Sequence, residues 1–138
     1  MHRLVGLVVG TVALVGALAG CSAPGVSYER VTAFPTDAPI ASIAPEDMGT
    51  PLALAHGADA LIVVVWGSSS CRPTPTGIDA GAAVPVITFA ADSKGGAACT
   101  ADLTSTMYSF PVSELGGAMP AKVVIVTDGV RSTVTVVD

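Results

Sequence analysis

The stretch that decides the fold is KVVIVTDGVRSTVTVV, residues 122–137 near the C-terminus. Two runs rich in Val, Ile and Thr stand on either side of Asp128 and Gly129. Such β-branched side chains favour strands, because they pack well on a pleated surface. An Asp-Gly pair suits a type I′ turn, since both central residues of that turn need a positive φ. The stretch therefore predicts a β-hairpin with strands over residues 122–127 and 130–137.

Further strand-like segments precede this hairpin, with no amphipathic helical pattern between them. Residues 60–66 are apolar at every position, as expected of a strand that is covered on both faces. Residues 104–112 alternate instead, which predicts one buried face. The residues on that face are Thr106, Tyr108, Phe110 and Val112. Two shorter candidates are residues 52–55 and residues 84–91, where Pro85 requires a strand start or an edge position.

Together these signals predict an all-β domain over residues 52–138. About six or seven short strands are expected, arranged as a small antiparallel β-sandwich or barrel. Large core side chains are few, so valine must supply most of the buried area. The large candidates are Trp66, Phe89, Tyr108 and Phe110. A disulfide would help to stabilise so small a core.

The N-terminus has the pattern of a secretory signal peptide. Arg3 precedes an uncharged apolar run that closes on Leu18-Ala19-Gly20-Cys21. This ending resembles the lipobox of bacterial lipoproteins. The resemblance implies transfer of a diacylglyceryl group to the Cys21 thiol, removal of residues 1–20, and a mature chain anchored by lipid on the extracytoplasmic face of the cell membrane. The alternatives are a plain signal peptide or an uncleaved anchor, although a membrane-spanning helix needs about 20 apolar residues.

Residues 21–51 follow as a segment rich in Pro, Ala and Ser. Such a composition favours extended, weakly structured backbone, and we interpret the segment as a tether between the lipid and the domain. A short strand is compatible with residues 26–33, where Tyr28 and Val31 are apolar.

The cysteine count agrees with this interpretation. The chain has three cysteines, and lipidation of Cys21 would leave Cys71 and Cys99 as a pair. An exported protein meets conditions that permit a disulfide. The alternative, a redox-active pair, lacks a Cys-x-x-Cys spacing. We therefore expect a structural bridge between Cys71 and Cys99.

Charge narrows the classes of partner. The chain has six basic and eleven acidic residues, for a net charge of −5. No basic stripe is present that could neutralise phosphates, which argues against nucleic acid. The same balance argues against electrostatic adhesion to anionic lipids. The expected partners are the membrane, through the lipid anchor, and an envelope protein or cell-wall component.

The residues from Trp66 to Pro73, and later Ala98 to Asp102, resemble segments of small lipoproteins from high-GC Gram-positive bacteria. In these proteins a hydrophobic strand runs into a Trp-Gly-Ser-Ser-Cys-x-Pro segment, and a second Cys follows downstream. The resemblance implies the β-fold and the disulfide, and it carries no activity.

Catalytic and metal chemistry have little support. A nucleophile among Ser68, Ser69 and Ser70 would need His56, which a hairpin over residues 52–66 places about 20 Å away. No Gly-x-Ser-x-Gly elbow, zinc ligand set, calcium loop or phosphate loop occurs, so no catalytic residue, metal or cofactor is assigned.

The sequence is therefore compatible with three functions. The preferred one is a non-catalytic binding or structural module at the cell envelope. The others are an extracytoplasmic serine hydrolase that uses residues 68–70, and an accessory subunit of a membrane complex.

Overall fold

The computed structural model describes residues 25–34 and 48–138. The expected signal peptide, its lipobox cysteine Cys21 and much of the expected tether lie outside these residues. None of the helices in these two ranges has the length and hydropathy of a membrane-spanning segment.

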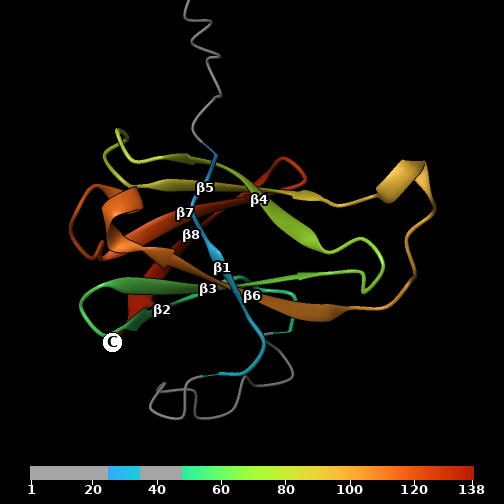
Figure 1. Cartoon of the computed structure of the whole chain (residues 1–138), viewed down its shortest axis with the longest axis horizontal. Coiled ribbons are helices and arrows are strands. Elements are labelled where there is room, and N and C mark those ends of the chain that lie inside the picture. Colours follow the sequence, from blue (N-terminus) through green and yellow to red (C-terminus); the bar gives the residue numbers. More distant parts are fainter. Residues whose placement is uncertain (1–24, 35–47) are drawn as a thin grey trace, which may run out of the picture.

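The described chain forms eight strands and two short 3₁₀-helices (Figure 1). The strands are β1 (Glu29–Val31), β2 (Leu52–His56), β3 (Ala60–Gly67), β4 (Pro73–Asp79), β5 (Val86–Ala91), β6 (Thr104–Pro111), β7 (Lys122–Thr127) and β8 (Val130–Val137). The 3₁₀-helices are η2 (Lys94–Gly96) and η3 (Val112–Leu115). All strands belong to one sheet with the order β1-β6-β3-β2-β8-β7-β5-β4. The all-β class expected from the sequence is confirmed.

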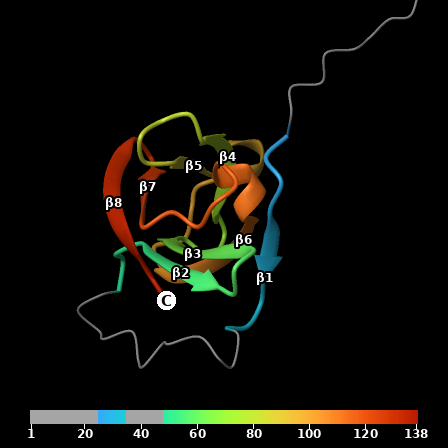
Figure 2. The same cartoon turned by 90° about the vertical axis from the view of Figure 1, so that its left-hand side faces the viewer.

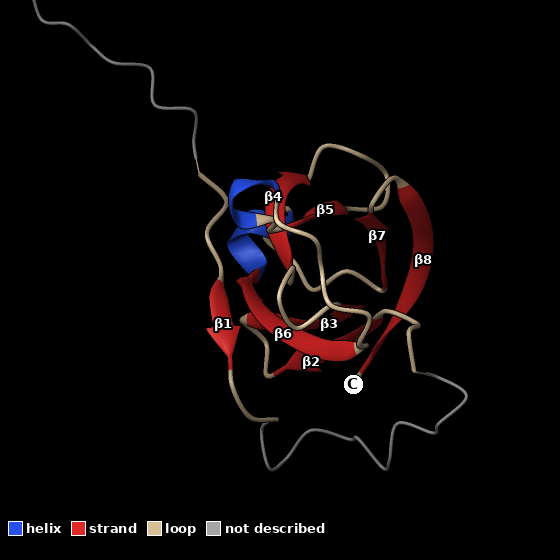
Figure 3. Cartoon of the chain, turned by 90° about the vertical axis from the view of Figure 1, so that its right-hand side faces the viewer, coloured by secondary structure: helices blue, strands red, loops and turns tan. Residues whose placement is uncertain are grey.

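The sheet curls into a half-barrel, as the end-on views show (Figures 2 and 3). One wall contains β6, β3 and β2, the opposite wall contains β7, β5 and β4, and β8 joins the two walls. Along most of its length β8 pairs with β7, and its last residues pair with β2. The right-handed twist of strands produces such curling in an open sheet of this size.

One detail of the predicted architecture was wrong: the sheet is mixed, because β2 pairs with β8 and β5 pairs with β7 in parallel. Residues 52–138 form seven strands, in agreement with the expected six or seven, and β1 adds an eighth strand from residues 26–33, where a short strand was compatible with the sequence. The chain leaves β5, crosses to β6 in the other wall and only then returns to β7. Side-chain periodicity predicts which face of a strand is buried and does not predict its neighbour, so these pairings were not visible in the sequence.

The hairpin predicted at the C-terminus is confirmed. Strands β7 and β8 are antiparallel, with Thr127 opposite Val130. The two turn residues have positive φ, 50° at Asp128 and 81° at Gly129. These are the signs that a type I′ turn requires.

The core fills the inside of the curl. Every residue from Leu61 to Val65 is buried, which confirms that β3 is covered on both faces. The predicted inner face of residues 104–112 is buried as well. Phe89 and Phe110 pack edge to face in this core, with ring centroids 6.2 Å apart. Trp66 was expected in the core and is only half-buried, where its indole N–H donates to the carbonyl of Thr50 at 3.0 Å.

The open side of the curl lies between β4 and β6, and we call it the seam. One end of the seam is closed by η3, which packs against both strands. Along the seam, the Tyr108 hydroxyl of β6 donates to the carbonyl of Pro73 in β4 at 2.7 Å. The edge strand β1 pairs with β6 and flanks the seam. Side chains from β1, β4 and β6 can therefore meet here.

Candidate functional site

The predicted disulfide is confirmed: Cys71 and Cys99 are joined, 28 residues apart in sequence, with Cα atoms 5.4 Å apart. Cys71 is buried in the loop that leaves β3, and Cys99 lies in the exposed segment that leads to β6. Strands β3 and β6 pair as far as Gly67 and Thr104. The chain between the two cysteines forms β4 and β5, and the bridge joins the two ends of this segment just beyond the end of the β3–β6 pairing.

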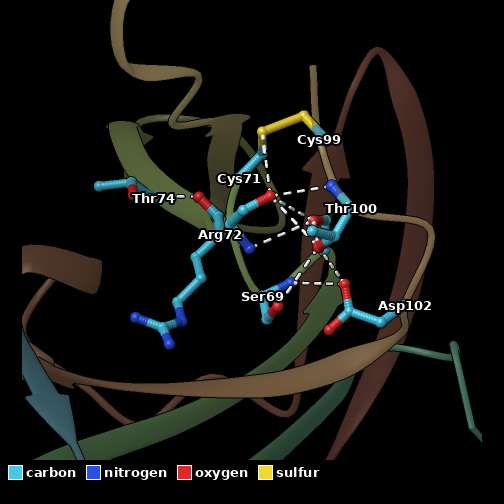
Figure 4. The surroundings of a disulfide bond; sticks show 9 residues. Ser69, Cys71, Arg72, Thr74, Cys99, Thr100 and Asp102 are labelled. Atoms are coloured by element: carbon cyan, nitrogen blue, oxygen red, sulfur yellow. Dashed lines mark hydrogen bonds between the residues drawn. A yellow bond between two sulfur atoms is a disulfide. The ribbon is translucent and has the colours of Figure 1, made fainter. Parts of the chain in front are cut away.

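Five polar residues form a hydrogen-bonded cluster beside the disulfide, which we call the serine clasp (Figure 4). Its members are Ser68, Ser69, Ser70, Thr100 and Asp102. The Thr100 hydroxyl oxygen lies 2.7 Å from that of Ser68 and 3.2 Å from that of Ser70. The Thr100 amide donates to Ser70 Oγ at 2.9 Å, and the Ser69 amide donates to Asp102 Oδ1 at 3.2 Å. The clasp joins the same two chain segments as the disulfide.

Asp102 is the charged end of the clasp. Hydrogen bonds from Ser69 and from Thr100 lower the pKa of the Asp102 carboxyl to about 2. The carboxylate accepts a hydrogen bond from the Thr100 hydroxyl. A hydroxyl has one proton to donate and two lone pairs, so Thr100 Oγ1 can only accept from the serines while it donates to Asp102.

This arrangement lacks the parts of an activated serine nucleophile. A serine needs a neighbouring general base to take its proton, and a carboxylate with a pKa of about 2 is a weak base. His56 pairs with Ala60 at the start of β3, whereas the serines follow Gly67 at its other end. Eight strand residues at about 3.3 Å each separate His56 from the serines by more than 20 Å. The structure therefore does not bring these residues together.

A cavity of about 400 Å³ lies beside the clasp, at the seam. It draws residues from β1, β4, β6, the loop after β3 and the residue that follows β5. Its lining residues are Tyr28, Arg30, Ser69, Ser70, Arg72, Thr74, Asp92 and Tyr108. We call it the seam cavity. Its volume falls within the range of small-molecule sites, about 300–1,000 Å³.

Two aromatic side chains form one wall of the seam cavity. Arg30 is the cross-strand partner of Tyr108, so both side chains leave the sheet on the same face. Tyr28, two residues before Arg30, shares that face and meets Tyr108 edge to face with centroids 5.4 Å apart. Burial raises the pKa of the Tyr108 phenol, and the positive charges of Arg30 and Arg72 act in the opposite direction. The charges of both guanidinium groups thus lower the pKa of the Tyr108 hydroxyl, against the effect of burial.

The backbone around Arg72 is held on both sides. Cys71 before it is bridged, and Pro73 after it is buried. The Arg72 carbonyl accepts the Asp92 amide at 3.0 Å and the Thr74 hydroxyl at 3.3 Å. Figure 4 shows that the Arg72 side chain points away from the disulfide and from the clasp.

No sequence motif marks Arg30, Arg72 or Tyr28 as ligand-binding residues, and Tyr28 was noted only as an apolar residue of a possible short strand. The one sequence feature that could have indicated a binding role is the small number of basic residues. Residues 25–138 contain only five, and one of them directly follows a bridged cysteine. Their convergence depends on the pairing of β1 with β6 and on the curl of the sheet, neither of which the sequence reveals.

The described ranges, 25–34 and 48–138, contain no cluster of three or more His, Cys, Asp or Glu side chains able to hold a metal ion. No family model, curated protein or solved structure matches the chain. Function has to be inferred from the residues themselves.

Proposed function

We propose that the protein is a lipid-anchored binding module on the extracytoplasmic face of the cell membrane, with a non-catalytic role towards an envelope or cell-wall component. Residues 1–20 would be removed as a signal peptide, and Cys21 would carry the lipid. Residues from Cys21 onward would then link the membrane to the β-domain.

One observation carries this proposal. The Cys71–Cys99 disulfide uses two of the three cysteines and leaves Cys21, which stands at the last position of the Leu18-Ala19-Gly20-Cys21 motif. Disulfides persist in oxidising, extracytoplasmic compartments. The bridge and the motif therefore support the same location by independent routes. Two acyl chains give stable anchoring where a single chain gives marginal, reversible binding.

The non-catalytic part of the proposal rests on the serine clasp. Its hydroxyls are engaged with Thr100, and the nearest carboxylate is held in its ionised form. Labelling of the purified protein with a fluorophosphonate probe tests this point. We expect no labelling, whereas labelling that disappears in Ser68→Ala, Ser69→Ala or Ser70→Ala would establish the hydrolase alternative.

The anchor is tested by expressing the whole chain in a Gram-positive bacterium and separating membrane from medium. We expect wild type in the membrane fraction, with a mass that shows loss of residues 1–20 and a diacylglyceryl group on Cys21. Cys21→Ser should remove the lipid and the maturation, and Ser22→Ala is the matched control that should keep both. Wild-type protein that retains Met1, or that lacks lipid on Cys21, would overturn the proposal.

A further inference from the structure

The seam cavity concentrates positive charge in an acidic protein. The chain as a whole has a net charge of −5, and residues 25–138 contain five basic residues. Two of those five, Arg30 and Arg72, line this one cavity. They come from separate parts of the chain, β1 and the loop after β3. The single acidic residue of the lining is Asp92, which leaves the cavity with an excess of one positive charge.

No residue in the described part of the chain occupies either guanidinium group, so both can bind a ligand. Neither donates a hydrogen bond to residues 25–34 or 48–138, and neither lies within 4.0 Å of a carboxylate there. A guanidinium has five N–H donors in a planar fork that matches the oxygens of a phosphate or a carboxylate. Such charge-assisted, bidentate contacts are among the stronger hydrogen bonds in proteins.

The backbone of both arginines is fixed beside the cavity. The Arg72 backbone is fixed by the neighbouring disulfide and by two hydrogen bonds to its carbonyl. The Arg30 backbone is fixed by its position opposite Tyr108 in the β1–β6 ladder. The Tyr108 hydroxyl donates its proton to the Pro73 carbonyl and is not available as a donor to a ligand. A ligand would therefore meet two cations whose backbone is fixed, which lowers the entropic cost of binding. The Ser69, Ser70 and Thr74 hydroxyls of the lining already bond to Thr100 and to the Arg72 carbonyl, so the two guanidinium groups supply the donors of the proposed site.

The remaining lining residues restrict the ligand further. The cavity, at about 400 Å³, has room for more than a bare oxyanion. Tyr28 is 39% exposed and presents an aromatic surface to the apolar face of a sugar or a polyol chain. The Asp92 carboxylate can accept a hydrogen bond from a hydroxyl or an amine of the same ligand. A bare anion would leave both of these groups unused.

We propose that the seam cavity binds an organic phosphate, with the phosphate group between Arg30 and Arg72 and a hydroxyl or amine of the organic part on Asp92. The same chemistry is offered by a soluble phosphate ester and by the phosphodiester units of an envelope polymer. The inference deepens the proposed function, because it names the ligand class, and it rests on that function for where the ligand is met.

Titration calorimetry on the full mature chain, kept in neutral detergent, tests this site. The probes are glycerol phosphate as a monoester, glycerophosphoglycerol as a diester, and glycerol as the neutral control. We expect saturable binding of at least one phosphate probe and none of glycerol. Stronger binding of the diester would identify a polymer unit as the source, and stronger binding of the monoester would identify a soluble ester. Saturable binding of glycerol, or of neither phosphate probe, would overturn the proposal.

Three single variants separate this site from general electrostatics. Arg30→Gln and Arg72→Gln each remove one donor fork and should weaken binding about tenfold, which corresponds to the loss of a charge-assisted hydrogen bond. Arg131→Gln makes the same charge change on exposed β8, away from the cavity, and should leave affinity within about twofold. Equal weakening in all three variants would refute a specific site. Binding is measured on purified protein, so an absence of binding would refute the phosphate site without affecting the test of the lipid anchor. An absence of lipid on Cys21 would refute the anchor without affecting the binding test.

Discussion

Reduction of the Cys71–Cys99 bridge should destabilise the domain by an amount that follows from the loop it closes. The two cysteines are 28 residues apart. For a loop of that length the chain-entropy relation gives about 12 cal/mol/K, or about 3.6 kcal/mol at 25 °C. This is a large share of the 5–15 kcal/mol by which domains of about this size are usually stable. For a chain of this length it corresponds to a fall in Tm of about 10–20 °C.

The measurement is urea unfolding of wild type before and after reduction, followed by the fluorescence of Trp66. Reduction leaves both sulfur atoms in place, so it isolates the cross-link from the packing of Cys71, which is 4% exposed. Cys99 is exposed, which gives a reductant access. The midpoint should fall and the slope m should rise, because the unfolded chain exposes more surface without the bridge. Cys71→Ala/Cys99→Ala should unfold no later than the reduced wild type. A change below about 1 kcal/mol on reduction would show that the chain-entropy argument does not hold for this domain.

Two further predictions concern the segment around the bridge. Gly67→Ala would place a Cβ 2.5 Å from Cδ of buried Pro73, and it should lower the free energy of unfolding in urea by about 1–3 kcal/mol. The control is Gly77→Ala, whose Cβ would meet nothing within 4 Å and which should be close to neutral. Equal effects of the two variants would contradict a steric clash at Gly67. Asp102 has a folded pKa of about 2 against an ordinary 3.8, so its contribution to stability is present above pH 3.8 and is lost as the pH falls through about 2. Asp102→Asn should flatten the pH dependence of the midpoint within that window, and an unchanged dependence would show that the clasp does not stabilise the fold.

The sequence predicted those features that depend on local pattern. The turn at Asp128 and Gly129 is encoded by residues that tolerate positive φ. Burial of β3 on both faces follows from an unbroken apolar run. The disulfide followed from counting cysteines. In each case the physical cause of the feature lies in the residues that form it, so no distant partner has to be known.

Features that depend on distant partners were not visible. Strand β4 contains Pro73 and Pro75, which argue against a strand, yet it forms at the outer edge of the sheet, where a proline need not donate to a ladder. Its register shifts between Pro75 and Gly77, which further weakens any alternating pattern. The seam cavity exists because β1 docks on β6 while β4 closes the curl from the other side, and no local pattern encodes that meeting.

The segment from Trp66 to Pro73 links the fold to the proposed site, because nearly every residue in it has a structural task. Trp66 donates to Thr50, and Gly67 leaves room for the Pro73 ring. The three serines enter the clasp, and Cys71 enters the bridge. The Pro73 carbonyl accepts the Tyr108 hydroxyl across the seam.

Arg72 is the exception, because its side chain is exposed and donates no hydrogen bond to the described residues around it. Four constraints nevertheless fix its backbone: the bridge, the buried proline that follows and the hydrogen bonds from Asp92 and Thr74. A side chain that must meet a second cation at a set distance requires such a support. These constraints set the point at which the Arg72 side chain leaves the backbone, at the edge of the cavity that Arg30 also lines, which is the requirement of the proposed phosphate site.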